Sequence, residues 1–250
     1  MSLDRTLTAT RMGLLDQVRR PLLIVMLVVI PIIFISWGAR ATPETPKPLT
    51  LPDDTQVLTD MRALMTVVDV PIAVAFLAGL VGVFVVNSAL ESDRRLVVAG
   101  YSPFEAVVPR LVVLTIAVVV ITVVSLVVMA FSFTPKSWGP FIVGTLIAGL
   151  IYAAIGALSG ALMGRLGAVY FMFFLPNVDI GIAQDPIFFD GDPQGWATVL
   201  PGYGPTRMIV EASYSGDFAP AGALAPALAW LIVLWIAVVL LLRRAVSPQR

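Results

Sequence analysis

The residues of this chain that could do chemistry are carboxylates and lysines, because the 250-residue sequence contains neither cysteine nor histidine. Their absence excludes thiolate nucleophiles, zinc sites built from cysteine and histidine, and mechanisms that need an imidazole. Asp185, Asp190 and Asp192 lie close together in sequence and could bind a divalent cation in a membrane-embedded lipid hydrolase. The ordinary role of such aspartates as loop and turn formers is favoured. We therefore expect no catalytic residue, metal site or cofactor in this chain.

A second polar group interrupts two long apolar runs. Residues 87–114 read NSALESDRRLVVAGYSPFEAVVPRLVVL. Gly100 permits a sharp turn, Ser102 can cap a new helix, Pro103 suits its first position and Glu105 can complete a capping box. The spacing predicts two helices joined by a compact, charged turn. An ordinary capped helix in a charged loop explains the same spacing.

The elements that position these residues are expected to be membrane-spanning helices. The chain is 58% hydrophobic and 13% charged, against about 45–50% and about 25% in soluble domains. Its net charge of zero gives no reason to expect nucleic-acid binding. We predict an all-α polytopic protein with a single transmembrane domain over residues 1–250 and six spans. The spans are expected at Pro21 to Trp37, Val70 to Ala89, Leu111 to Phe133, Phe141 to Met163, Leu166 to Ile182 and Ala221 to Leu242.

The distribution of basic residues predicts the orientation. With the N-terminus in the cytoplasm, eleven of the 16 Lys and Arg residues lie inside, as the positive-inside rule requires. We therefore expect both termini in the cytoplasm of a plasma membrane. The alternative is a signal peptide over residues 1–41, but the apolar run is longer than such peptides use.

Three segments outside the spans have their own predicted roles. Residues 1–20 place leucines within one arc, which predicts an amphipathic helix on the inner membrane surface, with a solvated lead-in as the alternative. Residues 38–69 contain four prolines and predict an extended outer loop. Residues 177–220 mix aromatic residues with Pro and Gly, which predicts structure at the outer face, including a short helix that begins at Pro205.

Small and charged residues near the fourth and fifth spans suggest contacts. Gly156, Gly160 and Gly164 recur every four residues, which favours close packing within the chain, with a dimer seam as the alternative. Asp179 follows a proline that we expect to end the fifth span, so it is expected at the outer aqueous face. Asp179, or Asp69 at the end of the second span, could pair with Arg207 in an outer gate.

This layout resembles the type-2 ABC exporter permeases, through its six spans, interfacial helix, charged insert with Gly-x-Ser-Pro, and broken fifth span. In that family the insert is the coupling region, here residues 90–110, that contacts a separate ATP-binding subunit. Many members carry Gly-Thr after the charged run, where this chain has Arg95 and Leu96. The resemblance implies an ATPase-coupling interface at Glu91, Arg94, Arg95, Gly100, Tyr101, Ser102, Pro103, Phe104 and Glu105.

The resemblance also implies the partners. The chain has no G-x-x-x-x-G-K-[ST] phosphate loop, so ATP and Mg would be bound by the partner subunit. Two permease copies, or this chain and a related one, would stand above two ATP-binding subunits in a bacterial membrane. Short re-entrant helices after the fifth span would close the outer end of the pathway.

The aliphatic and aromatic character of the spans favours a hydrophobic, drug-like or lipid-like cargo. An ion-coupled secondary transporter is the alternative, but its usual signs are acids at mid-membrane and an inverted repeat. Asp69 and Asp179 lie near span ends, and no long repeat is evident. The aromatic residues available to line a pathway are Tyr152, Tyr170, Phe171, Phe173 and Phe174.

Overall fold

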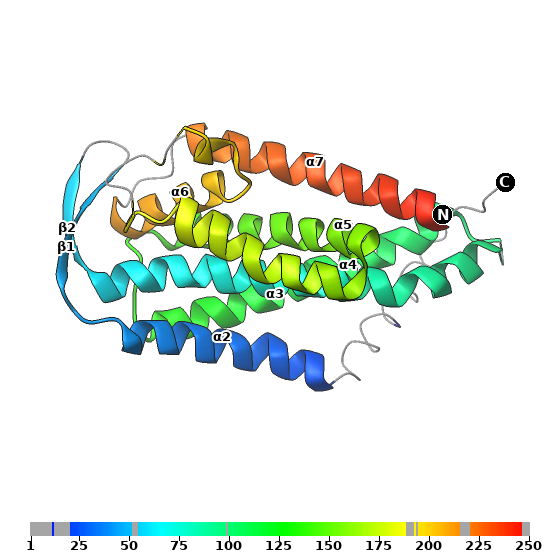
Figure 1. Cartoon of the computed structure of the whole chain (residues 1–250), viewed down its shortest axis with the longest axis horizontal. Coiled ribbons are helices and arrows are strands. Elements are labelled where there is room, and N and C mark those ends of the chain that lie inside the picture. The colour runs from blue at the N-terminus through cyan, green and yellow to red at the C-terminus, as the bar shows by residue number, and fades with distance from the viewer. Residues whose placement is uncertain are drawn as a thin grey trace.

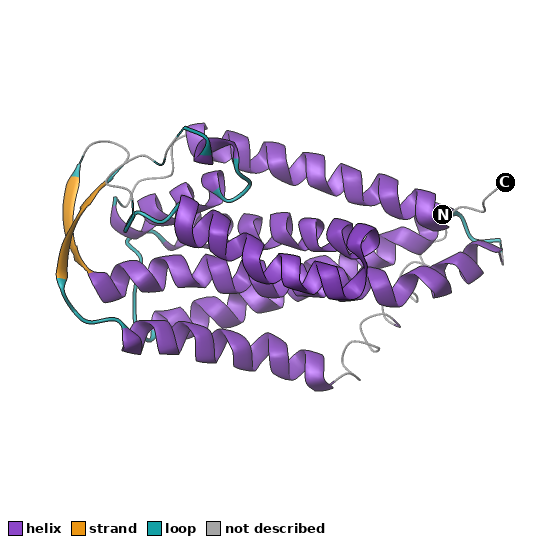
Figure 2. Cartoon of the chain, in the orientation of Figure 1, coloured by secondary structure: helices purple, strands orange, loops and turns teal. Residues whose placement is uncertain are grey.

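The computed structural model describes residue 12 and residues 21–51, 55–98, 100–188, 193, 195–215 and 221–246. Long helices form an elongated bundle, and a β-hairpin lies across one end (Figures 1 and 2). The expected interfacial helix over residues 1–20 falls outside the described residues, apart from residue 12. The elements are α2 (Pro21–Ala41), β1 (Pro46–Thr50), β2 (Gln56–Asp60), α3 (Met61–Val98), α4 (Pro103–Ala130), α5 (Trp138–Val178), the π-helix η1 (Asp179–Ala183), the 3-10 helix η2 (Ala197–Val199), α6 (Tyr203–Tyr214) and α7 (Ala221–Val246).

Four helices in the described part of the chain are long and apolar enough to cross a membrane. They lie within α3, α4, α5 continued into η1, and α7, and α2 adds a shorter apolar run at Leu27–Ala41. In α3, 83% of the most apolar window is buried inside the protein, against 39% in α4 and 17% in α7. The exposed apolar surfaces of α4 and α7 suit contact with lipid. The chain is therefore built as a membrane protein around α3.

The helix α5 contains both the fourth and the fifth predicted spans. It reverses direction at Gly164, whose φ of 72° and ψ of 173° are not helical. Tyr152 and Asp179 are 27 residues apart, yet the Tyr152 hydroxyl donates to Asp179 Oδ2 over 2.6 Å. A straight helix would hold them about 40 Å apart. The two halves of α5 therefore run antiparallel to each other, as a helical hairpin (Figure 1).

Glycines let α3 and α5 approach each other closely. A Cβ atom on Gly156 would lie 2.0 Å from the carbonyl oxygen of Gly79, and one on Gly160 would lie 3.1 Å from Val83 Cα. Both glycines thus pack within one chain, as small residues do between membrane helices. Gly164 does not share this contact, because no neighbouring atom lies within 4 Å of its Cβ position. It serves the reversal instead, where its positive φ favours glycine.

The segment after α2 corrects two predictions. It forms an antiparallel hairpin of β1 and β2, so the chain is not all-α and residues 38–69 are not an extended loop. Leu49 is buried and Val57 is partly buried against the core, whereas Pro48 and Leu58 are exposed. This period-two alternation is what one buried sheet face requires. The helix α3 begins at Met61, earlier than the expected Val70, and Asp60 Oδ1 accepts a hydrogen bond from Ala63 N over 2.7 Å at its start.

Candidate functional site

The predicted coupling turn lies at the end of the bundle opposite the β-hairpin (Figure 1). The C-terminus of α3 is closed by two hydrogen bonds of 3.1 Å, from Gly100 N to Val97 O and from Tyr101 N to Leu96 O. This pairing is a Schellman motif, which needs a left-handed residue just after the helix. Gly100 supplies it with a φ of 94°. Gly100 and Tyr101 therefore satisfy the last backbone carbonyls of α3.

The N-terminus of α4 is also capped by hydrogen bonds. Glu105 N donates to Ser102 Oγ over 3.2 Å, and Ser102 N donates to Glu105 Oε2 over 3.1 Å. Pro103 occupies the first turn, where no donor is lost. The sequence-based capping box is therefore present. Hydrogen-bonded caps therefore join this turn to the ends of both α3 and α4.

Apolar side chains at the turn point both inward and outward. Val107 is buried in a cluster with Leu242 and Val246 of α7, and Val97 packs against this cluster. Outside, Val98 is 82% exposed and Phe104 is 44% exposed. The ends of α3 and α4 at this turn therefore pack against α7 and present an apolar pair to their surroundings.

The remaining residues of the predicted interface extend along the same end. Arg95 is exposed on the last turn of α3, and Tyr101 is half-buried in the turn. The backbone of Glu91 and Arg94 continues α3, while their side chains lie outside the described part. Val98 was not among the interface residues predicted from the sequence. Its position between the charged run and Gly100 was the signal that could have identified it.

A buried polar network forms at the end of the bundle that carries the β-hairpin. Asp179 is only 1% exposed. Its carboxylate accepts from Tyr152 OH at 2.6 Å, from Gly202 N at 2.8 Å and from Gln184 Nε2 at 3.5 Å. The network joins the first half of α5, the end of its second half and the segment that leads into α6. Three donors offset much of the cost of burying a carboxylate.

Two predictions about this region are wrong. The fifth span does not end at Pro176, since α5 runs on to Val178 and η1 follows, so Asp179 is inside the protein and not at an aqueous face. Arg207 does not pair with Asp179, whose partners are those named above. Arg207 Nε donates to Glu211 Oε1 over 3.1 Å, because both lie one turn apart on α6.

Asp185 is a buried carboxyl group just after the apolar helix that ends at Ala183. It is 3% exposed and accepts a hydrogen bond from Ile187 N over 2.8 Å. Burial raises the pKa of Asp185 to about 6, while the Ile187 N–H and the Lys47 ammonium act against that rise. Asp190 and Asp192 fall outside the described residues, and within those described no group of three His, Cys, Asp or Glu side chains is placed to hold a metal ion.

The aromatic residues considered for a pathway divide into two sets. Tyr152 is fully buried and binds Asp179. Tyr170, Phe173 and Phe174 are 61%, 53% and 60% exposed on the second half of α5. The exposed set lies on the outside of a single chain, where lipid or another subunit would cover it.

Comparisons with protein-family models, with curated proteins and with solved structures find no match.

Proposed function

We propose that this chain is the membrane subunit of an ATP-driven ABC exporter, and that residues 95–105 receive motion from a separate ATP-binding subunit. The doubly capped turn with Val98 and Phe104 exposed is the observation that carries this proposal. An apolar pair on a rigid aqueous turn suits burial by a protein partner. The contacts of Val107 with α7 give that partner a mechanical connection to the bundle.

In the proposed cycle, the partner subunits hydrolyse ATP and this chain changes conformation. ATP and Mg would be bound and used by two partner subunits, whose closure pushes on the turn of each of two permease chains. Six crossings, with α5 counted twice, would then reorient between inward and outward states. The Asp179 network would hold the outer segment against α5 in one of these states, because it joins the two by hydrogen bonds.

We propose a hydrophobic, drug-like or lipid-like cargo. An apolar groove of about 290 Å³ between α4 and α5 includes Val123 and Val127, which are exposed on the surface of α4. Such a groove suits a molecule that arrives from the membrane better than a charged sugar.

Affinity purification tests the coupling role. The full-length chain is purified from native membranes in mild detergent, and its companions are identified by mass spectrometry. A variant with Val98→Asp and Phe104→Asp should lose an ATP-binding subunit that the native chain retains. Val199→Asp is the matched control, since Val199 is 67% exposed at the opposite end. Absence of any ATPase with the native chain, or equal loss in the control, would contradict the proposal.

An ion-coupled secondary transporter is the rival function. The buried Asp179 at the end of a helix favours it, because such acids bind coupling ions in that class. Reconstituted vesicles distinguish the two. Cargo movement that needs ATP and the partner supports the exporter, whereas movement that needs only an ion gradient and is lost in Asp179→Asn supports the rival.

A further inference from the structure

Within the residues that the structure describes, one edge of the β-hairpin is blocked and the other is open. The hydrogen bonds from Met61 N to Thr45 O and from Leu51 N to Thr55 O, both 2.9 Å, fix which residues pair inward. Along an antiparallel pair, backbone groups point alternately toward the partner strand and away from it. The residues of β1 whose backbone groups point away include Pro46 and Pro48, and proline has no N–H. That edge therefore cannot pair with another strand.

The edge of β2 has the opposite character. Its outward positions are Gln56, Leu58 and Asp60, each with both an N–H and a C=O. The sheet has two strands in the part of the chain that the structure describes, so no third strand covers this edge there. An unprotected strand edge is a template for pairing with another chain.

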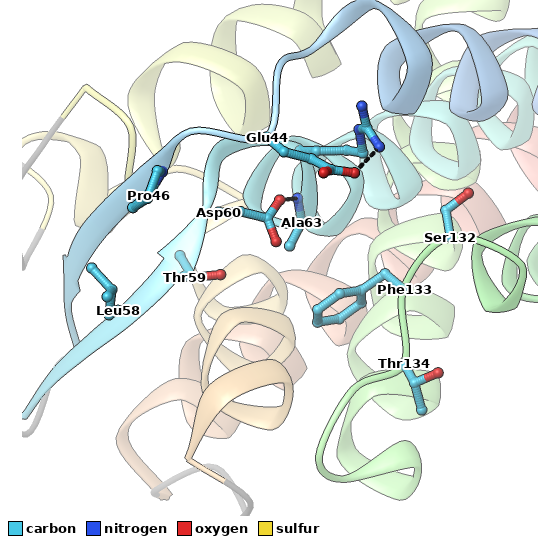
Figure 3. Close-up of a pocket in the computed structure, with 10 residues that line it drawn as sticks. Glu44, Pro46, Leu58, Thr59, Asp60, Ala63, Ser132, Phe133 and Thr134 are labelled. Atoms are coloured by element: carbon cyan, nitrogen blue, oxygen red, sulfur yellow. Dashed lines mark hydrogen bonds and ion pairs between the residues drawn. The ribbon is translucent and has the colours of Figure 1, made fainter.

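Space for such a strand exists beside β2. A cleft of about 620 Å³ adjoins β2 (Figure 3), and its lining residues are Leu58, Thr59 and Asp60 of β2, Arg62 and Ala63 of α3, Glu44 and Pro46, and Ser132, Phe133 and Thr134. Leu58 is 75% exposed. Leu58 lies at the centre of this edge, so its side chain would contact any strand that pairs there.

We propose that β2 pairs with β2 of a second copy of this chain, in antiparallel register with Leu58 opposite Leu58. This register is self-complementary, as a two-fold interface must be. The two leucines contact each other, and each Gln56 side-chain amide lies opposite the carboxylate of Asp60 in the partner. The inference rests on the two-copy arrangement of the proposed function and names where the copies bind.

The orientation of the hairpin agrees with two copies in one membrane. The strands run across the long axis of the bundle (Figure 1), and Leu49 and Leu51 of the hairpin face the core. The perpendicular to the sheet therefore runs roughly along the helices. Antiparallel pairing of two identical edges places the two-fold axis along that perpendicular, hence along the membrane normal. Only such an axis lets both copies keep the same inside and outside.

Cysteine cross-linking tests the register directly, because the native chain contains no cysteine. The single variant Leu58→Cys is treated in native membranes with a short bifunctional thiol reagent that spans about 5 Å. A hydrogen-bonded antiparallel pair has Cα and Cβ atoms both about 5.5 Å apart, which is within reach of the reagent but too wide for a direct disulfide. We expect at least tenfold more covalent dimer than in two matched controls.

The controls exploit the geometry of the sheet. Pro48→Cys would place its sulfurs three strand spacings apart, about 14 Å, and Gln56→Cys would place them four residues apart along the strand, about 13 Å. The reagent is too short to bridge either distance. Equal cross-linking of all three variants, or none with Leu58→Cys, would overturn the proposed pairing.

A second variant does not depend on cross-linking chemistry. Leu58→Lys would place two ammonium groups across the axis, and we expect at least a fivefold smaller dimer fraction by native mass spectrometry with an unchanged Tm. An unchanged dimer fraction counts against the pairing. The same preparations are probed for the ATP-binding partner: its presence without cross-linking refutes the hairpin contact alone, and cross-linking without it refutes the exporter alone.

Discussion

At the scale of single residues, Asp179 shows how this chain accommodates a buried carboxylate. Its donors come from residues 152, 184 and 202, which are distant in sequence. The capping box of Ser102 and Glu105 is local and could be predicted from spacing alone, whereas the Asp179 network depends on the reversal of α5. The sequence predicted a break between Met163 and Leu166, where the structure has the reversal at Gly164, but no local pattern shows that Tyr152 and Asp179 meet across it.

Gly202→Ala should destabilise the protein through this network. An added Cβ would lie 2.7 Å from Asp179 Oδ1, so the carboxylate must move away from its donors. We expect a loss of about 1–3 kcal/mol in the free energy of unfolding, read as a lower Tm in detergent. Gly195→Ala is the control, since nothing lies within 4 Å of its Cβ position. Equal Tm values for the two variants would count against the network.

Asp185→Asn should stabilise the outer segment in a pH-dependent way. The pKa of Asp185 is raised from 3.8 to about 6 in the folded protein. The contribution of its protonated carboxyl group to the free energy of unfolding is therefore fully present below about pH 4. That contribution is lost as the pH rises to about 6, because the unfolded chain releases the proton first. At 1.36 kcal/mol per pKa unit the loss is at most about 3 kcal/mol.

The Asn side chain stays neutral at every pH, so the variant does not lose this stability as the pH rises. Its Tm should exceed that of the native chain at pH 7.5 and approach it at pH 4. A Tm difference that stays constant between these two pH values would show that Asp185 does not titrate as described.

At the scale of elements, the contact of α3 with α5 organises the bundle. Gly79 and Gly156 bring the two backbones together, so side chains elsewhere on α3 can be buried on all sides. The recurrence of small residues predicted a close contact but could not choose its partner, because a second copy would need the same spacing.

Gly156→Ala should weaken this contact. The new Cβ would lie 2.0 Å from Gly79 O, a backbone atom that can move only if the helices separate. We expect a cost of roughly 1–3 kcal/mol or more, measured as a fall in Tm. Gly139→Ala, which meets nothing within 4 Å near the start of α5, should be neutral or slightly stabilising. A neutral Gly156→Ala variant would mean that the two helices do not touch there.

Other elements were harder to predict from the sequence. The outer prolines suggested an extended loop, yet in β1 they occupy the edge positions where no hydrogen bond is lost. The apolar positions of Leu49, Leu51 and Val57 alternate, but prolines and polar residues between them hid this pattern. Tertiary packing onto the core, which the sequence does not display, supports the hairpin.

At the scale of the whole molecule, the two ends of the bundle differ in character. One end has a short, capped turn with exposed apolar side chains, and the other carries a sheet and a buried polar network. The hydropathy of the chain was enough to predict a helical membrane protein, and the structure agrees in its four long apolar helices. The six crossings and their orientation remain predictions.

Labelling from each side of the membrane tests that orientation. Val98→Cys should react with an impermeant thiol reagent only in inside-out vesicles, and Val199→Cys only in right-side-out vesicles. Both side chains are largely exposed, so access and not burial decides the result. Labelling of both variants from the same side would refute the predicted topology.

The single-residue reversal of α5 at Gly164 has a consequence for biosynthesis. Only this residue leaves the helical conformation, so the chain supplies no aqueous loop to hold the first half in the bilayer while the second is still being synthesised. We expect the two halves to enter the lipid together, with Tyr152 meeting Asp179 during insertion. A topology reporter fused after Arg165 should then give a mixed signal, and one fused after Val178 a single outer signal. The order of synthesis would thus assemble the outer network before α7 leaves the ribosome.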